Sequence, residues 1–160
     1  MSRTSWARRR IAVVASLGIA LLAGTASTAQ ADPLGGLIIN HGTGRCLAMG
    51  GQEGPTADTC DEKNGAQEWK VHRRDDGTVR IEAVWAPDSD RCLASYIYGG
   101  VSLGSCDDGS TGPIWDIRDG GKLSHFGDEK WCLTVKDGDL ITTDCDSGYN
   151  RYQDWVLPVS

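Results

Sequence analysis

One pattern occurs three times along the chain and restricts its possible folds more than any other feature. Each copy opens with Cys-Leu and has a second cysteine 13 or 14 positions later, followed by Asp. Each ends with Trp, one free position and an aliphatic residue. The closing tryptophans are Trp69, Trp115 and Trp155, so the period is 46 residues and then 40. A unit of this length, present three times, predicts an architecture in which repeated units bury a shared core.

Short apolar segments within each copy predict β-strands. Asp76-Gly77 and Asp119-Gly120 each lie between two such segments, and Asp-Gly between strands predicts a hairpin whose two turn residues have positive φ. No helical periodicity persists beyond the first 31 residues. We therefore expect an all-β domain with about four strands per copy and twelve in total. Three such units can close on one another and remove exposed sheet edges.

The first 31 residues have the features of a secretory signal peptide. Four arginines precede an apolar run from Ile11 to Ala23, and Ala29-Gln30-Ala31 matches an A-x-A cleavage site. The alternative is a membrane anchor, but the run is shorter than the roughly 20 residues that span a bilayer. We expect cleavage near Ala31–Asp32, which leaves a secreted domain over residues 32–160.

Charge and cysteine content limit the partners of this domain. Removing residues 1–31 takes away four arginines and no acid, so the formal net charge falls from −6 to −10. Phosphate backbones and anionic lipid repel such a domain, so we expect neither nucleic-acid binding nor membrane insertion.

All six cysteines remain after cleavage, and an even number in a small exported domain predicts disulfides.

The repeated Cys-Leu, Cys-Asp and Gln-x-Trp elements resemble those of the ricin-type β-trefoil lectins. Gln67-Glu68-Trp69 and Gln153-Asp154-Trp155 match the Gln-x-Trp signature, whereas the middle copy departs from it with Pro113-Ile114-Trp115. The compact spacing is similar to that of actinohivin-like repeats. The resemblance covers almost all of residues 32–160. It implies a β-trefoil with threefold pseudosymmetry, repeats at about 34–73, 78–118 and 121–160, and up to three shallow sugar sites.

Within this framework, each pair of cysteines is expected to close the loop of its own repeat. The expected disulfides are Cys46–Cys60, Cys92–Cys106 and Cys132–Cys145. Closing a loop of about fifteen residues stabilises a fold by roughly 3 kcal/mol in the chain-entropy model. Zinc binding fits poorly, because zinc ligands usually lie two to four residues apart and exported thiols oxidise. We expect no metal and no cofactor. We expect the two signature glutamines to form hydrogen bonds with the backbone. We expect all five signature side chains in the core: Gln67, Trp69, Trp115, Gln153 and Trp155.

The sugar-binding residues that the resemblance implies are missing from all three repeats. Sugar-binding members usually carry Asp two residues after the first cysteine, but this chain has Ala48, Ala94 and Thr134. The aromatic residue of the plant-toxin type, two before the second cysteine, is replaced by Asp58, Gly104 and Thr143. The Asn before Gln-x-Trp is replaced by Ala66, Gly112 and Tyr152. Any sugar site in this chain is therefore expected to be non-standard.

Other side chains offer replacement contacts, mainly in the middle and third repeats. Tyr96 and Tyr98 lie two apart, so in a strand they share one face, where they either stack on a sugar or simply cover the barrel. In the third repeat the candidates are Asp137, Asn150 and Tyr152, although Asp137-Gly138 is also typical of a plain turn. The first repeat offers Gln52, Glu53, Asp58 and Asn64 but no aromatic residue between its cysteines, so we expect it to be the least suited to a sugar.

Two classes of function remain after enzymes are set aside. His41, His72 and His125 are scattered, and none of the common hydrolase, zinc-protease or phosphate-loop motifs is present. We expect no enzymatic activity. The favoured interpretation is a secreted protein that binds a glycan or polysaccharide. The alternative is a β-trefoil that has lost sugar binding and contacts a protein, as an inhibitor or toxin accessory.

Overall fold

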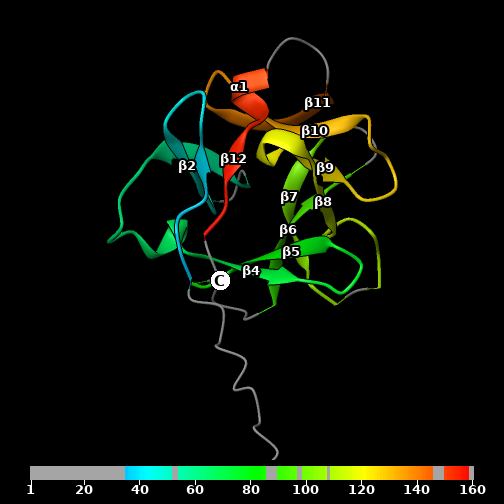
Figure 1. Ribbon diagram of the computed structural model, residues 1–160. Helices are drawn as coiled ribbons and strands as arrows, with labels where there is room; N and C mark the ends of the chain where they lie inside the picture. Colours follow the sequence, from blue (N-terminus) through cyan, green and yellow to red (C-terminus); the bar gives the residue numbers. More distant parts are fainter. Residues whose placement is uncertain are drawn as a thin grey trace, which may run out of the picture. The chain divides into compact units, whose positions relative to one another are not determined.

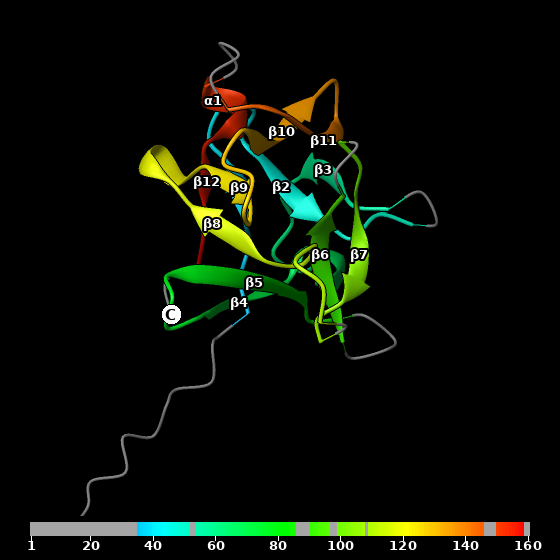
Figure 2. The same ribbon diagram turned by 90° about the vertical axis from the view of Figure 1, so that its right-hand side faces the viewer.

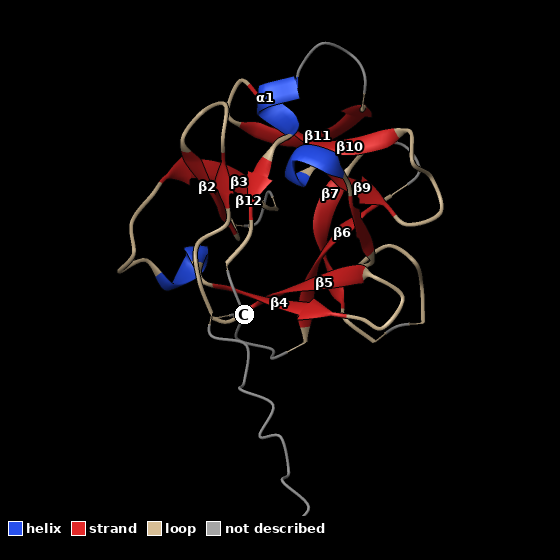
Figure 3. Cartoon of the chain, in the orientation of Figure 1, coloured by secondary structure: helices blue, strands red, loops and turns tan. Residues whose placement is uncertain are grey.

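A computed structural model describes residues 35–51, 54–85, 90–96, 99–107, 109–145 and 150–158. These residues form twelve short strands and three short helical segments, so the all-β prediction is confirmed (Figure 3). The strands are β1 (Ile39–Asn40), β2 (Arg45–Ala48), β3 (Thr56–Thr59), β4 (Trp69–Arg73), β5 (Thr78–Ala83), β6 (Arg91–Ser95), β7 (Val101–Ser105), β8 (Trp115–Ile117), β9 (Leu123–His125), β10 (Trp131–Lys136), β11 (Asp139–Asp144) and β12 (Trp155–Val156). The helical segments are η1 (Gly65–Gln67), η2 (Asp119–Gly121) and α1 (Asn150–Gln153). The predicted signal peptide and its cleavage site lie outside the described residues.

The strands pair antiparallel in one curled sheet. Its order is β12-β1-β2-β3-β11-β10-β9-β8-β5-β6-β7, and β4 pairs with β5. Three hairpins, β2–β3, β6–β7 and β10–β11, extend from this sheet, one in each copy of the sequence pattern (Figures 1 and 2). The first and last strands run side by side, because Ile39 pairs with Val156 and Asn40 pairs with Trp155 (Figure 1). Together with the bridges Gly36–Trp69 and Lys122–Asp154, this pairing closes a ring of the strands β1, β4, β5, β8, β9 and β12.

The three signature tryptophans make the same contact in each copy. Trp69 Nε1 donates to the carbonyl oxygen of Leu47 at 2.9 Å, Trp115 Nε1 to Leu93 at 2.8 Å and Trp155 Nε1 to Leu133 at 3.0 Å. Each acceptor lies directly after the first cysteine of its copy. The indole therefore fills the core while its N–H satisfies a buried carbonyl group. The tryptophans share this core with the buried aliphatic residues Ile38, Leu47, Val71, Val79, Ile81, Leu93, Leu123, Leu133, Val135 and Leu140.

The three disulfides have the predicted pairing. Cys46–Cys60, Cys92–Cys106 and Cys132–Cys145 join the open ends of the three hairpins, with Cα–Cα distances of 5.0, 5.0 and 4.9 Å. No free cysteine is found among the described residues. The described segments also contain no helix that is long and apolar enough to cross a membrane.

The hairpin turns differ in detail from the sequence-based expectation. Asp75, Asp76 and Gly77 form a three-residue loop closed by the Arg74 N–H donating to Thr78 O at 2.9 Å, and only Gly77 among them has positive φ. Asp119-Gly120 lies within η2 rather than in a two-residue turn. Both turn residues have positive φ at Asp137-Gly138, with φ of 55° and 97°, where β10 and β11 are joined by these two residues alone. A two-residue connection requires this geometry, whereas a longer loop needs only one such residue.

Candidate functional site

In the middle repeat, the three positions that normally carry the family's sugar contacts lie together. A Cβ atom placed on Gly104 would lie 3.5 Å from the Ala94 Cβ, and one on Gly112 would lie 3.8 Å from it. Ala94 itself is only 1% exposed. The fold therefore brings these positions together as the resemblance implies. Because they are occupied by Ala and Gly, none of them offers a side-chain acceptor for a sugar hydroxyl.

Tyr96 lies at the edge of this group of small residues. It follows β6 in the loop toward β7, where its N–H donates to Gly100 O and its own carbonyl accepts from Gly99 N, both at 3.0 Å. Its side chain is 54% exposed, and its hydroxyl lies 3.6 Å from where a Gly104 Cβ would be. The ring is thus held next to the position of the missing aromatic residue. Tyr98 lies outside the described residues.

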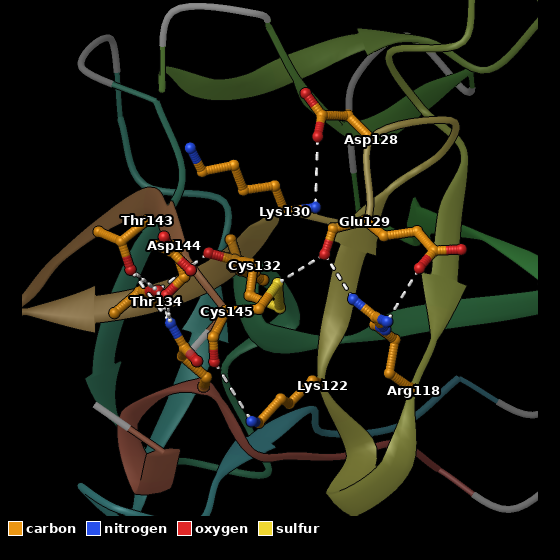
Figure 4. Close-up of a disulfide and its surroundings, with 12 residues drawn as sticks. Arg118, Lys122, Asp128, Glu129, Lys130, Cys132, Thr134, Thr143, Asp144 and Cys145 are labelled. Carbon is orange, nitrogen blue, oxygen red and sulfur yellow. Dashed lines mark hydrogen bonds and ion pairs between the residues drawn. A yellow bond between two sulfur atoms is a disulfide. The ribbon is translucent and has the colours of Figure 1, made fainter. Parts of the chain in front are cut away.

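In the third repeat the corresponding positions form a polar network with Gln153 (Figure 4). Thr134 Oγ1 donates to Cys132 O at 2.9 Å and lies 2.8 Å from Thr143 Oγ1. Gln153 Nε2 lies within hydrogen-bond distance of Asp144 O, Thr143 Oγ1 and Thr134 Oγ1, at 2.9, 3.1 and 3.2 Å. Thr134 is 1% exposed and Gln153 is fully buried. These hydroxyl groups serve the fold and are not presented to a ligand.

The other candidates of the third repeat come from separate elements. Asp137 is exposed at the tip of the β10–β11 hairpin, where Gly138 O accepts from Ala57 N at 3.3 Å and joins this tip to β3. Tyr152 lies on α1 and is 42% exposed, and its carbonyl accepts from Asn40 Nδ2 at 2.9 Å. Asn150 begins α1, which is all that the structure describes of it. The described contacts thus link Asp137 to the first repeat and Tyr152 to β1.

The glutamine signature ties the end of a hairpin to the segment before the tryptophan. Gln67 Nε2 donates to Thr59 O at 2.9 Å and its Oε1 accepts from Asp61 N at 2.8 Å, on both sides of Cys60. Gln153 makes the matching bond to Asp144 O, next to Cys145. In the middle repeat Pro113 cannot make it. There the Asp90 carboxylate accepts from Ser105 Oγ at 2.6 Å and from Cys106 N at 3.2 Å.

The first repeat has an aromatic neighbour that its own sequence does not reveal. Ala48 is 2% exposed, and Asp58 accepts a hydrogen bond from Thr56 Oγ1 at 2.9 Å. Trp85, which follows β5, is 71% exposed and lies against Gly65 of η1. Trp85 was missed because it lies outside the repeated signature. One indication of a further aromatic site was present in the sequence, because only three of its six tryptophans belong to the repeated pattern.

Charged groups gather elsewhere, in an open cleft of about 340 Å³ beside the Cys92–Cys106 disulfide. Within it, His72 Nε2 lies 2.5 Å from Glu82 Oε2, and Arg80 Nη1 donates to Asp107 Oδ1 at 2.5 Å. The Arg80–Asp107 pair joins opposite charges across this cleft. In the described ranges, no group of three or more His, Cys, Asp or Glu side chains could hold a metal ion.

Two carboxyl groups outside this cleft have shifted pKa values. Partial burial, followed by the negative charge of Glu129, raises the pKa of Asp116 above its ordinary value of 3.8. Hydrogen bonds from Thr78 lower the pKa of Asp76. Thr78 donates through its hydroxyl at 2.6 Å and its N–H at 3.0 Å. Neither aspartate lies beside Tyr96, so these shifts bear on stability and not on ligand binding.

Comparison with solved structures shows that the fold is a β-trefoil. The designed threefold-symmetric protein ThreeFoil is 19% identical, with a TM-score of 0.59, over 78% of this chain and 97% of its own. An endo-β-galactosidase from Clostridium perfringens that releases GlcNAcα1-4Gal is 18% identical, with a TM-score of 0.62, over 78% of this chain and 32% of its own. A mosquitocidal holotoxin is 14% identical, with a TM-score of 0.64, over 78% of this chain and 17% of its own. No curated protein matches the chain.

The model of the ricin-type β-trefoil lectin domain matches residues 35–155. The chain belongs to this family of carbohydrate-binding modules. The match covers all three copies of the sequence pattern, and it confirms the resemblance on which the disulfide pairing and the fold were predicted.

Proposed function

We propose that this chain is a secreted, non-enzymatic lectin that binds a glycan through a non-standard site in its middle repeat. The observation that carries the proposal is the position of the Tyr96 hydroxyl beside Gly104, which together with Gly112 lies against Ala94. An aromatic ring next to small residues provides a flat surface for the apolar face of a sugar, and the phenol hydroxyl provides a hydrogen-bond partner. Tyr98 is proposed to extend this surface.

The disulfides and the N-terminal sequence support the proposal that the protein is secreted. Three disulfides are typical of an oxidising compartment, which a chain with the expected signal peptide would reach by export. We propose that cleavage occurs near Ala31–Asp32 and that the domain of residues 32–160 acts outside the cell.

The third repeat is proposed as a weaker, second contact region. Its Thr134–Thr143–Gln153 network uses its polar groups internally, so only peripheral side chains such as Asp137, Asn150 and Tyr152 would meet a glycan. The same network favours the alternative function, a trefoil without sugar binding that contacts a protein. Binding measurements separate the two functions.

The test is retention of the disulfide-intact protein on a panel of immobilised polysaccharides, with and without a chelator. We expect Tyr96→Ala to weaken binding by roughly tenfold, because it removes one stacked aromatic contact. Tyr96→Phe should keep part of the affinity, and binding should not depend on calcium.

Two further variants test the third repeat. Tyr152→Ala is the matched aromatic control, and Asp137→Asn keeps a residue that tolerates positive φ while it removes the charge. Binding that survives Tyr96→Ala but is lost with these variants would move the site to the third repeat. A folded protein that binds none of the polysaccharides would contradict the lectin proposal and favour a protein partner.

A further inference from the structure

A cleft of about 460 Å³ lies between the segment Gly35–Ile39 and the segment around η1. This volume falls within the range of small-molecule sites. Its lining combines apolar backbone and side chains with three polar side chains: Gly35, Gly36, Leu37, Ile39, Glu62, Asn64 and Glu68. None of the positions at which the family normally contacts sugar lies in this lining.

The floor of the cleft is held rigidly by the barrel. Gly36 N donates to Trp69 O at 2.9 Å, and Trp69 N donates back to Gly36 O at 3.0 Å. Trp69 is fully buried. The cleft therefore rests on a doubly hydrogen-bonded β-bridge between Gly36 and Trp69, and a ligand would find it already formed.

The polar side chains of the cleft are available to a ligand. Glu62 and Glu68 are exposed, and neither forms a hydrogen bond or ion pair through its carboxylate within the described part of the chain. Asn64 Oδ1 accepts from Ala66 N at 3.1 Å, which holds the amide in place and leaves its Nδ2 group as a donor. The site thus offers two carboxylate acceptors and one oriented amide donor.

Trp85 adds an aromatic surface next to these groups. A Cβ atom on Gly65 would lie 3.2 Å from Trp85 Cγ and 3.4 Å from its Cδ1, so the indole lies directly against this glycine. Gly65 follows Asn64 in the sequence, and Val84 N donates to Glu68 O at 3.0 Å, which fixes the segment that carries Trp85. At 71% exposure, Trp85 is the most exposed of the large hydrophobic side chains in the described residues. An exposed indole provides a flat apolar surface on which the ring of a sugar can stack.

We infer that this cleft and Trp85 form a second glycan site, which takes a pyranose without acidic substituents. The indole would stack on the apolar face of the sugar ring, Glu62 and Glu68 would accept hydrogen bonds from its hydroxyls, and Asn64 would donate one. The lining residues include two carboxylates and no cation, so uronate or sulfate groups would be repelled. The inference rests on the proposed lectin function but uses different residues.

The test follows the tryptophan fluorescence and polysaccharide retention of the full exported protein with its disulfides intact. The probes are soluble mannan and galactan as neutral polysaccharides and polygalacturonate as an acidic one. Mannan or galactan should shift the emission of the wild type to shorter wavelength, because stacking shields an exposed indole from water. Trp85→Ala should abolish this shift and weaken retention roughly tenfold. Trp85→Phe should restore part of the retention, and Glu68→Gln should weaken it less than Trp85→Ala does.

Val156→Ala is the matched control, since Val156 is 53% exposed and belongs to neither site. Full retention by Trp85→Ala, together with a loss in Tyr96→Ala, would overturn the second site while the lectin proposal stands. Loss in both single variants supports two sites that act together. Trp85-dependent binding to polygalacturonate would overturn the assigned sugar class. An unchanged emission and no retention on any probe, from a folded wild type, would contradict both proposals.

Discussion

Single side chains show how the scaffold is held at equivalent positions of the three repeats. The buried residues that make repeated hydrogen bonds are retained, as with Trp69, Trp115 and Trp155. The positions that would carry sugar acceptors hold Ala48, Ala94 and Thr134, which are 2%, 1% and 1% exposed. A small or internally bonded residue at such a position costs the fold nothing, because no charged group has to be desolvated.

The raised pKa of Asp116 predicts a pH dependence that a single substitution removes. The folded state holds this proton at a higher pH than the unfolded state, so the free energy of unfolding falls as the pH rises from about 3.8 through the raised pKa. Asp116→Asn should therefore be more stable than wild type at pH 7, and the difference should vanish below pH 3.8. Thermal unfolding between pH 3 and pH 7 measures this.

Asp76→Asn is the control, because its expected effect on the free energy of unfolding at pH 7 has the opposite sign. The Asp76 pKa is lowered by hydrogen bonds, so its stabilising effect is present at neutral pH and is lost as the pH falls through the lowered pKa. Its replacement should lower stability at pH 7. If both variants shift stability in the same direction, the assignment of these carboxyl groups is wrong.

Among the elements, the hairpins are held at their open ends by two independent links, a disulfide and a side chain from the segment before the tryptophan. Gln67 and Gln153 supply the second link in the first and third repeats. In the middle repeat, Pro113 occupies the glutamine position and cannot form this link. There the Asp90 carboxylate, which precedes β6, accepts hydrogen bonds from Ser105 and Cys106 instead. The departure from the Gln-x-Trp signature therefore has a structural replacement.

Gln153→Ala tests this link directly. It removes the donor of the buried Thr134–Thr143 network and leaves the Asp144 carbonyl without that bond, so we expect a loss of about 1–3 kcal/mol in the free energy of unfolding. Urea unfolding measures the change. Arg151→Ala, an exposed position on the same short helix, should stay within about 0.5 kcal/mol of wild type. Equal effects of the two substitutions would show that the network does not stabilise the fold.

For the domain as a whole, closure of the sheet depends on its last strand. β12 pairs with β1, and Trp155 is 3% exposed in the shared core. Deleting residues 155–160 removes both contributions. Loss of one buried tryptophan costs about 3–5 kcal/mol, which approaches the roughly 5–15 kcal/mol of a whole domain.

We therefore expect the chain that ends at Asp154 to show no cooperative unfolding transition in calorimetry. A chain that ends at Pro158 keeps every described contact of β12 and should unfold like the full protein. A cooperative transition in the shorter chain would mean that the first repeats form a stable core without closure.

The fold and the candidate sites differ in how far the sequence determined them. The repeated Cys-Leu, Cys-Asp and Trp spacing predicted the all-β class and one cysteine pair per unit, because these depend on interactions inside one unit and on its repetition. The trefoil was implied by the resemblance of this repeat to the ricin-type β-trefoil lectins. Turn geometry was harder to predict from the sequence, because Asp-Gly fits both a two-residue and a three-residue loop.

Contacts between repeats were decided only by the tertiary structure. Trp85 follows a strand of the second repeat, yet its indole lies against Gly65 of the first. The first repeat has no aromatic residue between its own two cysteines. Closing the sheet brings together loops that no periodic pattern relates, because their approach depends on how whole units pack and not on spacing along the chain. The repeat thus predicted the scaffold, whereas the packing of whole units decided which loops lie side by side.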